Sequence, residues 1–428
     1  MSSPKLDPLD QMVLDYSLVT NGYSGNAPNN PYPMLAEKRS KCPVMQGDVL
    51  LENMVPSMAD YMMTGRPTVS LFRYKDIHAV LMNPSDWLSH IVGDGFGAAV
   101  DNMLLTAMDG ADHDKFRATL QKPFMRSEIR KLIETMIRPV AVNEFIAQLR
   151  PKRKADLLRE FALPFPIRAM YAYFGFPHEE DLLSNLASWA IQVVAAPQAD
   201  PEIAKITVPQ SLVAGQSIYD TLLPIVQAYR MRGEMRIDIL GYMMQVEHEG
   251  KRFTDEEITA FIRMLLLAAG ETTTRSIANM IVQLLEYPDV LEEVRNDRTL
   301  VAKAVMETMR RDPTAAALAR VAARDLELNG TKFTKGTAVL LSIAAANRDP
   351  QTYEDPDRLW LKRPMRPLLS FGFGPHMCMG MHMALAEMEV ALNAILDLPN
   401  LRFDPAYPRP EIRGLNMRGP DAVHVLWD

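Results

Sequence analysis

The spacing of apolar residues along the chain predicts a protein built mainly of helices. Apolar side chains recur every three or four residues across residues 131–148 and 211–231, which is the period of an amphipathic helix. A longer segment, Asp255–Glu286, contains no proline and follows Thr254 in a Thr-Asp-Glu-Glu sequence that can cap a helix and complement its dipole. Such a helix is unusually long for a globular protein, so we expect it to cross the whole core.

Strand-like patterns are fewer and shorter. We expect strands within residues 67–73, 326–333, 339–343 and 422–427, where short apolar runs are bounded by turn residues. Residues 347–367 are rich in Pro, Asp and Arg, which is typical of an irregular loop. The sequence therefore predicts a mainly α fold (α+β), a helical body with small β-sheets at one side.

Length and composition bear on the number of domains. A chain of 428 residues exceeds the usual size of one domain, so length alone favours two or three. Hydrophobic residues make up 48% of the chain and charged residues 23%, which is ordinary for a globular protein with a substantial core. The sequence contains no repeat, low-complexity segment or flexible linker that would divide it. We therefore predict a single domain over residues 1–428.

Charge and cysteine content narrow the class of protein further. The formal net charge is -7, with acidic and basic residues interleaved, so nucleic acid is not an expected partner. Two cysteines, Cys42 and Cys378, cannot build a disulfide framework and indicate a reducing, cytoplasmic setting, with a single bridge between them as the less favoured alternative. The first residues do not resemble a signal peptide, and the apolar run 264–269 is far too short to cross a bilayer. We expect no membrane anchor.

The most informative segment begins at Phe371 and reads Phe-Gly-Phe-Gly-Pro-His-Met-Cys-Met-Gly. Here a glycine-rich loop brings Cys378 to the start of a predicted helix, where free backbone N–H groups and the helix dipole favour a thiolate. Gly374 and Gly380 would let the backbone lie close against a flat ligand. For a lone cysteine, a buried free thiol after a glycine turn is the simpler interpretation.

The offsets of Phe371, Gly372, Cys378 and Gly380 resemble the heme-binding signature of the cytochrome P450 family, in its soluble bacterial form. The resemblance extends from about residue 67 to the C-terminus. It implies a helical prism with small β-sheets at one side and heme b (iron protoporphyrin IX) as the cofactor. It also implies that Cys378 ligates the iron and that the other three residues bind the cofactor. A thiolate ligand of this kind favours O–O cleavage.

A second motif is the Glu-x-x-Arg sequence formed by Glu307 and Arg310. Residues three apart share a helix face and can pair, although an exposed pair would contribute little stability. In the P450 family, this pair lies buried behind the heme and joins a third arginine. Arg358, in a Pro-Asp-Arg-Leu sequence, resembles that third partner, although Leu359 replaces the usual Phe. The resemblance therefore implies a structural network of Glu307, Arg310 and Arg358.

A third motif lies halfway along the predicted long helix, where residues 267–274 read Leu-Ala-Ala-Gly-Glu-Thr-Thr-Thr. Glycine and alcohols are poor choices for a helix interior, which points to a function. A helix–helix contact made by small residues is the alternative. By resemblance, the helix bulges here to form an oxygen pocket, Glu271 and Thr272 are the catalytic pair that guides protons to dioxygen, and Ala268 and Ala269 form the floor of that pocket.

Four further residues are candidates for binding the carboxylates of the cofactor. His113 and Arg117 lie four apart on a predicted helix, Arg320 lies in an Ala-Arg-Val-Ala-Ala-Arg-Asp sequence, and His376 stands two residues before Cys378. Arginine and histidine supply the charge-assisted hydrogen bonds that buried carboxylates need. A lone histidine is usually structural, so the two histidines gain this role only through the resemblance, which implies that they contact heme propionates.

By resemblance, the substrate lies above the heme, enclosed by residues 87–103, 183–212, 264–272 and 314–319. These segments are largely apolar, and the alanines at 315–317 leave room for a bulky or polycyclic apolar molecule. The chain lacks the Gly-x-Gly-x-x-Gly fingerprint of flavin or nicotinamide binding, so we expect its electrons to come from a separate ferredoxin and ferredoxin reductase.

Basic residues gather in the segment 115–131. They are Lys115, Arg117, Lys122, Arg126, Arg130 and Lys131. This segment is either a docking face for an acidic ferredoxin or a solvated helix face, and the sequence favours neither.

The resemblance implies a heme-thiolate monooxygenase that hydroxylates or epoxidises an apolar small molecule with O2. One alternative is a peroxide-driven enzyme of the same fold, but such relatives usually lose the acid–alcohol pair that this chain keeps. Another is a heme-binding sensor or carrier, which would need no proton delivery. A helical scaffold without a cofactor would leave the Glu-Thr-Thr run at mid-helix unexplained. The sequence does not identify the substrate, the site of oxidation or the native electron donor.

Overall fold

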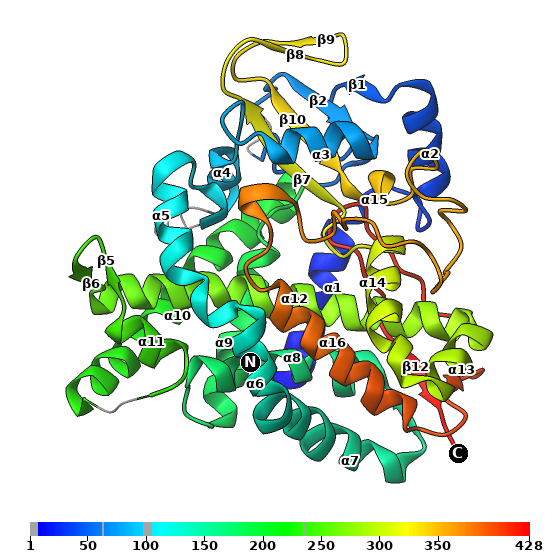
Figure 1. Ribbon diagram of the computed structural model, residues 1–428. Coiled ribbons are helices and arrows are strands. Elements are labelled where there is room, and N and C mark those ends of the chain that lie inside the picture. The colour runs from blue at the N-terminus through cyan, green and yellow to red at the C-terminus, as the bar shows by residue number, and fades with distance from the viewer. Residues whose placement is uncertain (1–6, 62–63, 97–104, 234–235) are drawn as a thin grey trace.

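Helices form most of the molecule, and the larger sheet lies at one end of the helical body (Figure 1). The protein is described from a computed structural model, which places residues 7–61, 64–96, 105–233 and 236–428. The mainly α fold with small sheets at one side, expected from the sequence, is confirmed. No helix in these four ranges combines the length and the apolar character that a membrane crossing requires.

The elements have the following bounds. The α-helices are α1 (Pro8–Gly22), α2 (Tyr32–Lys41), α3 (Tyr74–Met82), α4 (Gly93–Phe96), α5 (Gly110–Leu120), α6 (Arg126–Leu132), α7 (Ala147–Leu149), α8 (Pro164–Phe174), α9 (Glu180–Val194), α10 (Pro201–Arg232), α11 (Ile239–Gln245), α12 (Asp255–Glu286), α13 (Pro288–Asn296), α14 (Val301–Arg311), α15 (Ile343–Ala346) and α16 (Met381–Leu396). The strands are β1 (Val44–Gln46), β2 (Thr68–Leu71), β3 (Trp87–Leu88), β4 (Lys154–Asp156), β5 (Glu247–His248), β6 (Lys251–Arg252), β7 (Ala317–Ala322), β8 (Leu326–Leu328), β9 (Thr331–Phe333), β10 (Ala338–Ser342), β11 (Arg402–Phe403) and β12 (His424–Leu426).

The long helix predicted from the sequence is α12, and it has the predicted bounds. A capping box begins it: the backbone N–H of Glu257 donates to Oγ1 of Thr254 at 3.2 Å, and the backbone N–H of Thr254 donates to Oε2 of Glu257 at 2.8 Å. The helix crosses the middle of the molecule (Figure 1) and packs against α8, α9, α10, α14 and α16. Most of its residues are therefore buried on every face.

The predicted helix at residues 131–148 is helical but irregular. It continues α6 through two π-helical stretches, η6 (Ile133–Ile137) and η7 (Val140–Ile146), which lie on either side of Pro139. Proline has no backbone N–H to donate to the preceding turn, so the hydrogen-bond ladder changes its spacing there. The second predicted helix, residues 211–231, lies within α10, which already begins at Pro201.

The larger sheet has the strand order β1-β2-β10-β7-β3. β10 runs parallel to β2, with Val339 beside Val69, and antiparallel to β7, with Val339 opposite Arg320. A second sheet has the order β11-β12-β4, and β5-β6 and β8-β9 form two hairpins. β2, β8, β9, β10 and β12 occupy the four segments in which the sequence predicts strands, whereas β7 and the other described strands were not predicted. The sheet matters for function because β7 carries Arg320 into the interior.

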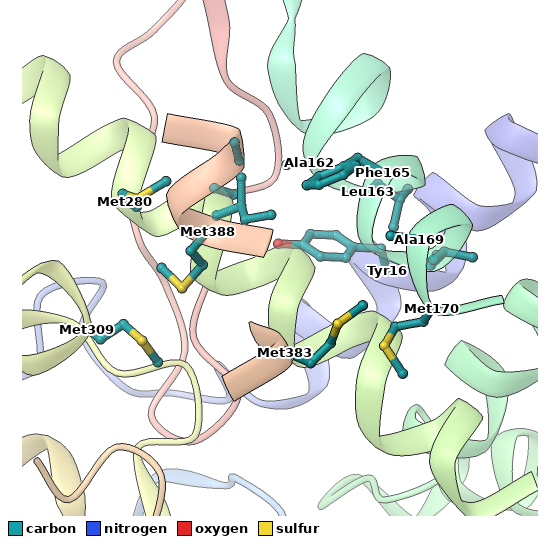
Figure 2. Close-up of a cluster of buried hydrophobic side chains, with 14 of the residues drawn as sticks. Tyr16, Ala162, Leu163, Phe165, Ala169, Met170, Met280, Met309, Met383 and Met388 are labelled. Atoms are coloured by element: carbon teal, nitrogen blue, oxygen red, sulfur yellow. The ribbon is translucent and has the colours of Figure 1, made fainter. Parts of the chain in front are cut away.

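The core beneath the central helix is rich in methionine. Figure 2 shows a cluster of buried side chains drawn from α1, α8, α12, α14, α16 and the short π-helix η9 (Leu158–Ala162) that precedes α8. Thioethers adapt to irregular gaps between helices, which suits a region where several helices meet at different angles. The labelled members are Tyr16, Ala162, Leu163, Phe165, Ala169, Met170, Met280, Met309, Met383 and Met388.

Candidate functional site

The cysteine loop leads directly into α16. Cys378 stands just before the helix, which begins at Met381 after the cap residue Gly380. The backbone N–H of Cys378 donates to the carbonyl of Phe371 at 2.8 Å and closes the loop. Gly372 has a φ of 69°, a left-handed conformation that a side chain would strain. The loop therefore needs glycine at 372 in order to return the cysteine to the start of the helix.

The sulfur of Cys378 lies in a recess of the protein. The residue is accessible and forms no disulfide, yet burial raises the pKa of its thiol above the ordinary value. An accessible but desolvated side chain lies in a recess and not on the outer surface. Backbone N–H groups of Gly380 and Met381 and the charge of Arg117 act in the opposite direction on this pKa. These are the groups that would stabilise a thiolate at a helix start.

Gly374 has a different role from the one that the sequence suggests. A Cβ at this position would lie 2.5 Å from the carbonyl oxygen of Leu81, and its φ is 70°. Gly374 therefore allows the loop to pass close to the end of α3, and this contact accounts for the glycine without a flat ligand. A Cβ at Gly380 would have Sγ of Cys378 as its nearest neighbour, at 4.0 Å, which fits a position beside the sulfur.

The middle of α12 differs from the rest of the helix in its exposure. Ala268 is exposed and Ala269 is partly exposed, whereas the residues from Ile258 to Leu266 are buried. Oγ1 of Thr272 donates to the carbonyl of Ala268 at 2.7 Å. The helix is α-helical throughout, so the bulge that the family resemblance implies is not seen here. An accessible patch in the middle of a buried helix indicates a recess beside Ala268.

Glu271 is buried and directed toward α1. Its Oε1 accepts a hydrogen bond from Nε of Arg275 at 2.7 Å. Arg275 also donates to Oγ1 of Thr20 at 2.9 Å and to the carbonyl of Tyr16 at 3.2 Å. Burial raises the pKa of Glu271, and the Arg275 charge opposes this without cancelling it. Oε2 is buried without a protein partner, so one oxygen of this carboxyl is free to exchange a proton.

The four predicted carboxylate-binding residues come together from three elements. His113 and Arg117 lie on α5, Arg320 on β7, and His376 in the short helix η11 (Gly374–His376). The rings of His113 and His376 have centroids 4.0 Å apart. Nε2 of His113 and Nδ1 of His376 are buried without a hydrogen-bond partner. Nη1 of Arg320 donates to the carbonyl of its own neighbour, Ala319, at 2.7 Å.

The electrostatics of this cluster favour an anionic ligand. Burial lowers the pKa of His376 to about 3, and the charges of Arg320 and His113 act in the same direction. Burial likewise lowers the pKa of Arg320 to about 10. Asp109 lies 3.9 Å from Nε2 of His376, but its oxygens already accept the backbone N–H groups of residues 89 and 90. Buried donors without acceptors are costly, so the donor set fits the two propionates of a heme.

The predicted pair of Glu307 and Arg310 is buried and has two hydrogen bonds. Nε of Arg310 donates to Oε2 of Glu307 at 2.8 Å, and Nη2 donates to Oε1 at 2.9 Å. Arg310 also donates from Nη1 to the carbonyl of Asn347 at 2.8 Å. The side chain of Asn347 reaches Ser370, whose hydroxyl donates to the carbonyl of Met309. The pair therefore holds the chain next to the cysteine loop.

The third arginine of this network is Arg363, and the prediction of Arg358 is wrong. Nε of Arg363 donates to Oε1 of Glu307 at 3.0 Å. Arg358 is exposed, and only its backbone carbonyl takes part, accepting from Arg310 at 3.3 Å and from Arg363 at 3.0 Å. The loop turns between the two arginines, so that residue 358 faces outward while residue 363 faces Glu307. The departure of Leu359 from the family pattern was the signal of this difference.

Two buried acids were not singled out from the sequence. Asp312 accepts hydrogen bonds from Tyr32 at 2.7 Å, Arg418 at 2.9 Å and Arg348 at 3.1 Å, and these groups outweigh its burial and hold its pKa below the usual range. Glu387 is buried in α16 and burial raises its pKa well above the usual value. Its place among the apolar residues of the predicted helix was a detectable signal, whereas nothing in the sequence marks Asp312.

Two of the predicted substrate segments can be placed. Ala316 and Ala317 are buried, and Cδ1 of Leu318 would lie 3.9 Å from a Cβ at Gly372, so residues 314–319 lie over the cysteine loop. Residues 264–272 include the accessible patch of α12. Of the predicted segment 87–103, residues 97–103 lie outside the described ranges.

The basic segment is less uniform than its sequence suggests. Lys115 pairs with Glu249 and Lys131 with Glu128, each at 2.6 Å, and Arg117 is close enough for its charge to act on Cys378. Lys122, Arg126 and Arg130 are exposed, and no ion pair of theirs occurs among the described residues. Met125, between them, is 53% exposed. The remaining basic patch, defined as Lys122, Arg126 and Arg130, surrounds an exposed apolar side chain.

Comparison with known proteins identifies the family. The sequence model of the cytochrome P450 family matches residues 214–416. The chain is 31% identical to cytochrome P450 109 of Bacillus spizizenii, over 77% of this chain and 78% of that protein. It is 30% identical to the cyclomarin C epoxidase CymV of Salinispora arenicola, over 77% and 82%. The structure of CYP109E1 from Bacillus megaterium in complex with testosterone has the same fold, with a TM-score of 0.81 and 24% identity over 93% of this chain and 98% of that chain. The cysteine loop and the buried Glu-Arg pair agree with these relatives. This chain therefore belongs to the cytochrome P450 family and is a heme monooxygenase.

Proposed function

We propose that this chain hydroxylates or epoxidises an apolar small molecule, using O2 and electrons from a separate ferredoxin and ferredoxin reductase, and that its cofactor is heme b. The observation that carries the proposal is the position of Cys378, in a recess at the start of α16 with two backbone N–H groups directed at its sulfur. We also propose that the chain forms one domain and works in the reducing cytoplasm, where its two free cysteines would persist.

Cys378 is the proposed iron ligand, with Phe371, Gly372 and Gly380 against the same face of the heme. Bound there, the heme supplies the activation of O2, one atom of which enters the substrate while the other leaves as water. The N–H groups of the helix start oppose the effect of burial on Cys378, because they stabilise the thiolate and not the thiol. Ala268 and Ala269 would border the oxygen pocket, where their small side chains would leave space.

Glu271 and Thr272 are the proposed proton-delivery residues. Oγ1 of Thr272 points back along α12 to the carbonyl of Ala268 and can accept and release a proton beside the accessible patch. Glu271 holds its proton more tightly than an exposed carboxyl, because burial raises its pKa. Arg275 fixes Oε1 of Glu271, which leaves Oε2 as the oxygen that exchanges protons.

His113, Arg117, Arg320 and His376 are the proposed propionate contacts. The two imidazoles have buried nitrogens without partners, and the two guanidiniums have pKa values lowered by burial. Propionate oxygens would accept hydrogen bonds from these donors and restore the charge balance. Anchored at the edge by these contacts and at the iron by Cys378, the heme would have a single orientation.

The substrate that we propose is bulky or polycyclic and apolar. Short alanine side chains at 315–317 precede Leu318, which approaches the cysteine loop at Gly372, and they would leave width for a substrate at that level. The Bacillus megaterium relative holds testosterone, and CymV is named for the epoxidation of cyclomarin C, so molecules of this size suit the fold. The electron donor would dock at the basic patch around Met125, since an acidic ferredoxin complements its charge.

One spectrum tests the proposal. The carbon-monoxide complex of the reduced protein should show the Soret band of thiolate-ligated heme, and Cys378→Ala should lose it while Cys42→Ala keeps it. A band at the imidazole position in the unaltered protein would contradict the assignment of Cys378.

Three further measurements separate the finer claims. Thr272→Ala should bind heme normally and divert reducing equivalents to hydrogen peroxide. Complete coupling in this variant would show that protons arrive by another route. Turnover with hydrogen peroxide alone, and none with ferredoxin and its reductase, would favour the peroxide-driven alternative. A library of apolar compounds screened for high-spin shifts would identify the substrate class.

A further inference from the structure

A second hollow, separate from the proposed heme site, lies between α1, α8, α9 and η7. Its volume is about 450 Å3. None of the proposed heme contacts lines it, although Leu183, Ser184 and Ala187 belong to the segment 183–212 that was expected to enclose the substrate. Its walls are mostly apolar and are contributed by residues that include Met12, Phe145, Ile167, Leu183 and Ala187. A hollow of this size with apolar walls is in the range that binds small organic molecules.

The charged residues at the rim of the hollow balance one another. Three lining residues are acidic and three are basic, namely Asp7, Glu160, Glu180, Lys152, Arg159 and Arg168. The bases are already paired: Lys152 lies 2.6 Å from Glu160, Arg159 lies 2.5 Å from Asp10, and Arg168 lies 2.5 Å from Glu180. A charged ligand would find no net opposite charge there. The rim therefore favours a neutral molecule.

Arg168 adds no open donor to this wall. Its Nη2 donates to Glu180 and its Nε lies 3.5 Å from Glu144, and its Nη1 is not accessible from the hollow. The hollow therefore offers a ligand apolar contact and balanced charge. We propose that the hollow is a second binding site, for a neutral apolar molecule, and that its occupancy acts on α12.

The connection to α12 passes through Ile167. This side chain lines the hollow, and its Cγ1 would lie 3.2 Å from a Cβ at Gly270. Gly270 stands between Ala269 and Glu271 in the accessible part of α12. Because protein interiors are close-packed, a ligand that presses on Ile167 displaces it toward Gly270. Occupancy of the hollow thus alters the helix segment that borders the proposed heme site.

Photo-crosslinking of the heme-loaded full chain with benzophenone tests the binding site. Benzophenone is neutral and apolar, has one ketone oxygen, and attaches to neighbouring C–H groups when irradiated. We expect peptide mapping to find adducts on residues of α8 and α9 that line the hollow. Ser184→Phe fills the hollow from its rim and should abolish these adducts, whereas Asn185→Phe, at an exposed neighbour that does not line it, should keep them. No adducts there, or adducts that persist in Ser184→Phe, overturn the proposal.

The action on α12 has its own measurement. The affinity of imidazole for the heme iron, followed optically, should change about fivefold or more when benzophenone is added, which is the lower range of couplings between sites. The change should remain in Asn185→Phe and disappear in Ser184→Phe. An unchanged affinity, or a change that Ser184→Phe retains because benzophenone competes in the heme pocket, overturns the coupling. The crosslinking result does not depend on the identity of the iron ligand.

Discussion

Replacement of Glu387 by glutamine should alter the pH dependence of folding. Glu387 is 1% exposed, and its Oε1 is buried without a hydrogen-bond partner. Burial raises the pKa of this carboxyl well above its usual value, so the folded protein favours its neutral form. In the unfolded chain the same group titrates near its ordinary pKa of about 4.3. Between the unfolded-state and folded-state pKa values, unfolding therefore releases a proton from Glu387.

The sign and size of the effect follow from this difference. The folded-state pKa is raised, so the stabilising contribution of the neutral carboxyl is complete below about pH 4.3 and declines as the pH rises toward the folded-state pKa. Each pH unit in that window lowers the free energy of unfolding by about 1.4 kcal/mol. Between about pH 5.5 and about pH 7.5, the unaltered protein should lose stability relative to Glu387→Gln, which has the same shape and does not ionise. The upper limit of this loss is ~2.7 kcal/mol, because a single proton is exchanged.

Urea unfolding of the heme-loaded protein, followed by far-ultraviolet circular dichroism at the two pH values, measures this difference. The denaturant slope should be equal in both proteins, so that the midpoints report stability alone. Glu327→Gln is the matched control, because Glu327 is exposed on β8. Its stability should follow that of the unaltered protein at both pH values. If Glu387→Gln also follows the unaltered protein, the carboxyl is ionised in the folded state and the reasoning fails.

The remaining predictions concern the cysteine loop and its support. Arg363→Ala should purify with less heme per chain than Arg358→Ala, because the guanidinium of Arg363 reaches Glu307 whereas Arg358 contributes its backbone carbonyl; equal heme absorbance in the two variants would restore the role of Arg358. Gly374→Ala should lower the melting temperature through a loss of about 1–3 kcal/mol, since a Cβ there would meet the carbonyl of Leu81 and the backbone φ is left-handed; an unchanged melting temperature would show that the loop can move away.

Local sequence signals predicted α12 and the cysteine loop well. The capping residues of α12 specify its start, and Pro288 immediately after its end limits its length, so the bounds depend on neighbours in sequence. The loop before α16 depends in the same way on Gly372, which is needed whatever packs around it. Features of this kind can be predicted from a single sequence because neighbouring residues in that sequence determine them.

Features decided by packing were predicted less well. Arg358 and Arg363 both lie in the irregular segment 347–367, and only the path of that loop decides which guanidinium reaches Glu307. The π-helical stretches around Pro139 have a comparable origin, because the sequence shows a proline but not how the ladder adjusts to it. In both cases, the structure depends on contacts between residues whose spacing in the sequence follows no regular period.

The carboxylate-binding cluster depends on both kinds of information. His113 and His376 lie on separate elements, and nothing in the composition or spacing of either segment indicates that their rings meet. The family resemblance brought them together, and their buried nitrogens without partners then give a physical reason for that arrangement. A protein gains nothing in stability from crowding two imidazoles beside Arg320 in a desolvated region, where burial and the charge of Arg320 disfavour the protonation of His376. An anionic cofactor reverses the balance, so this cluster is better explained by what it binds than by what it contributes to the fold.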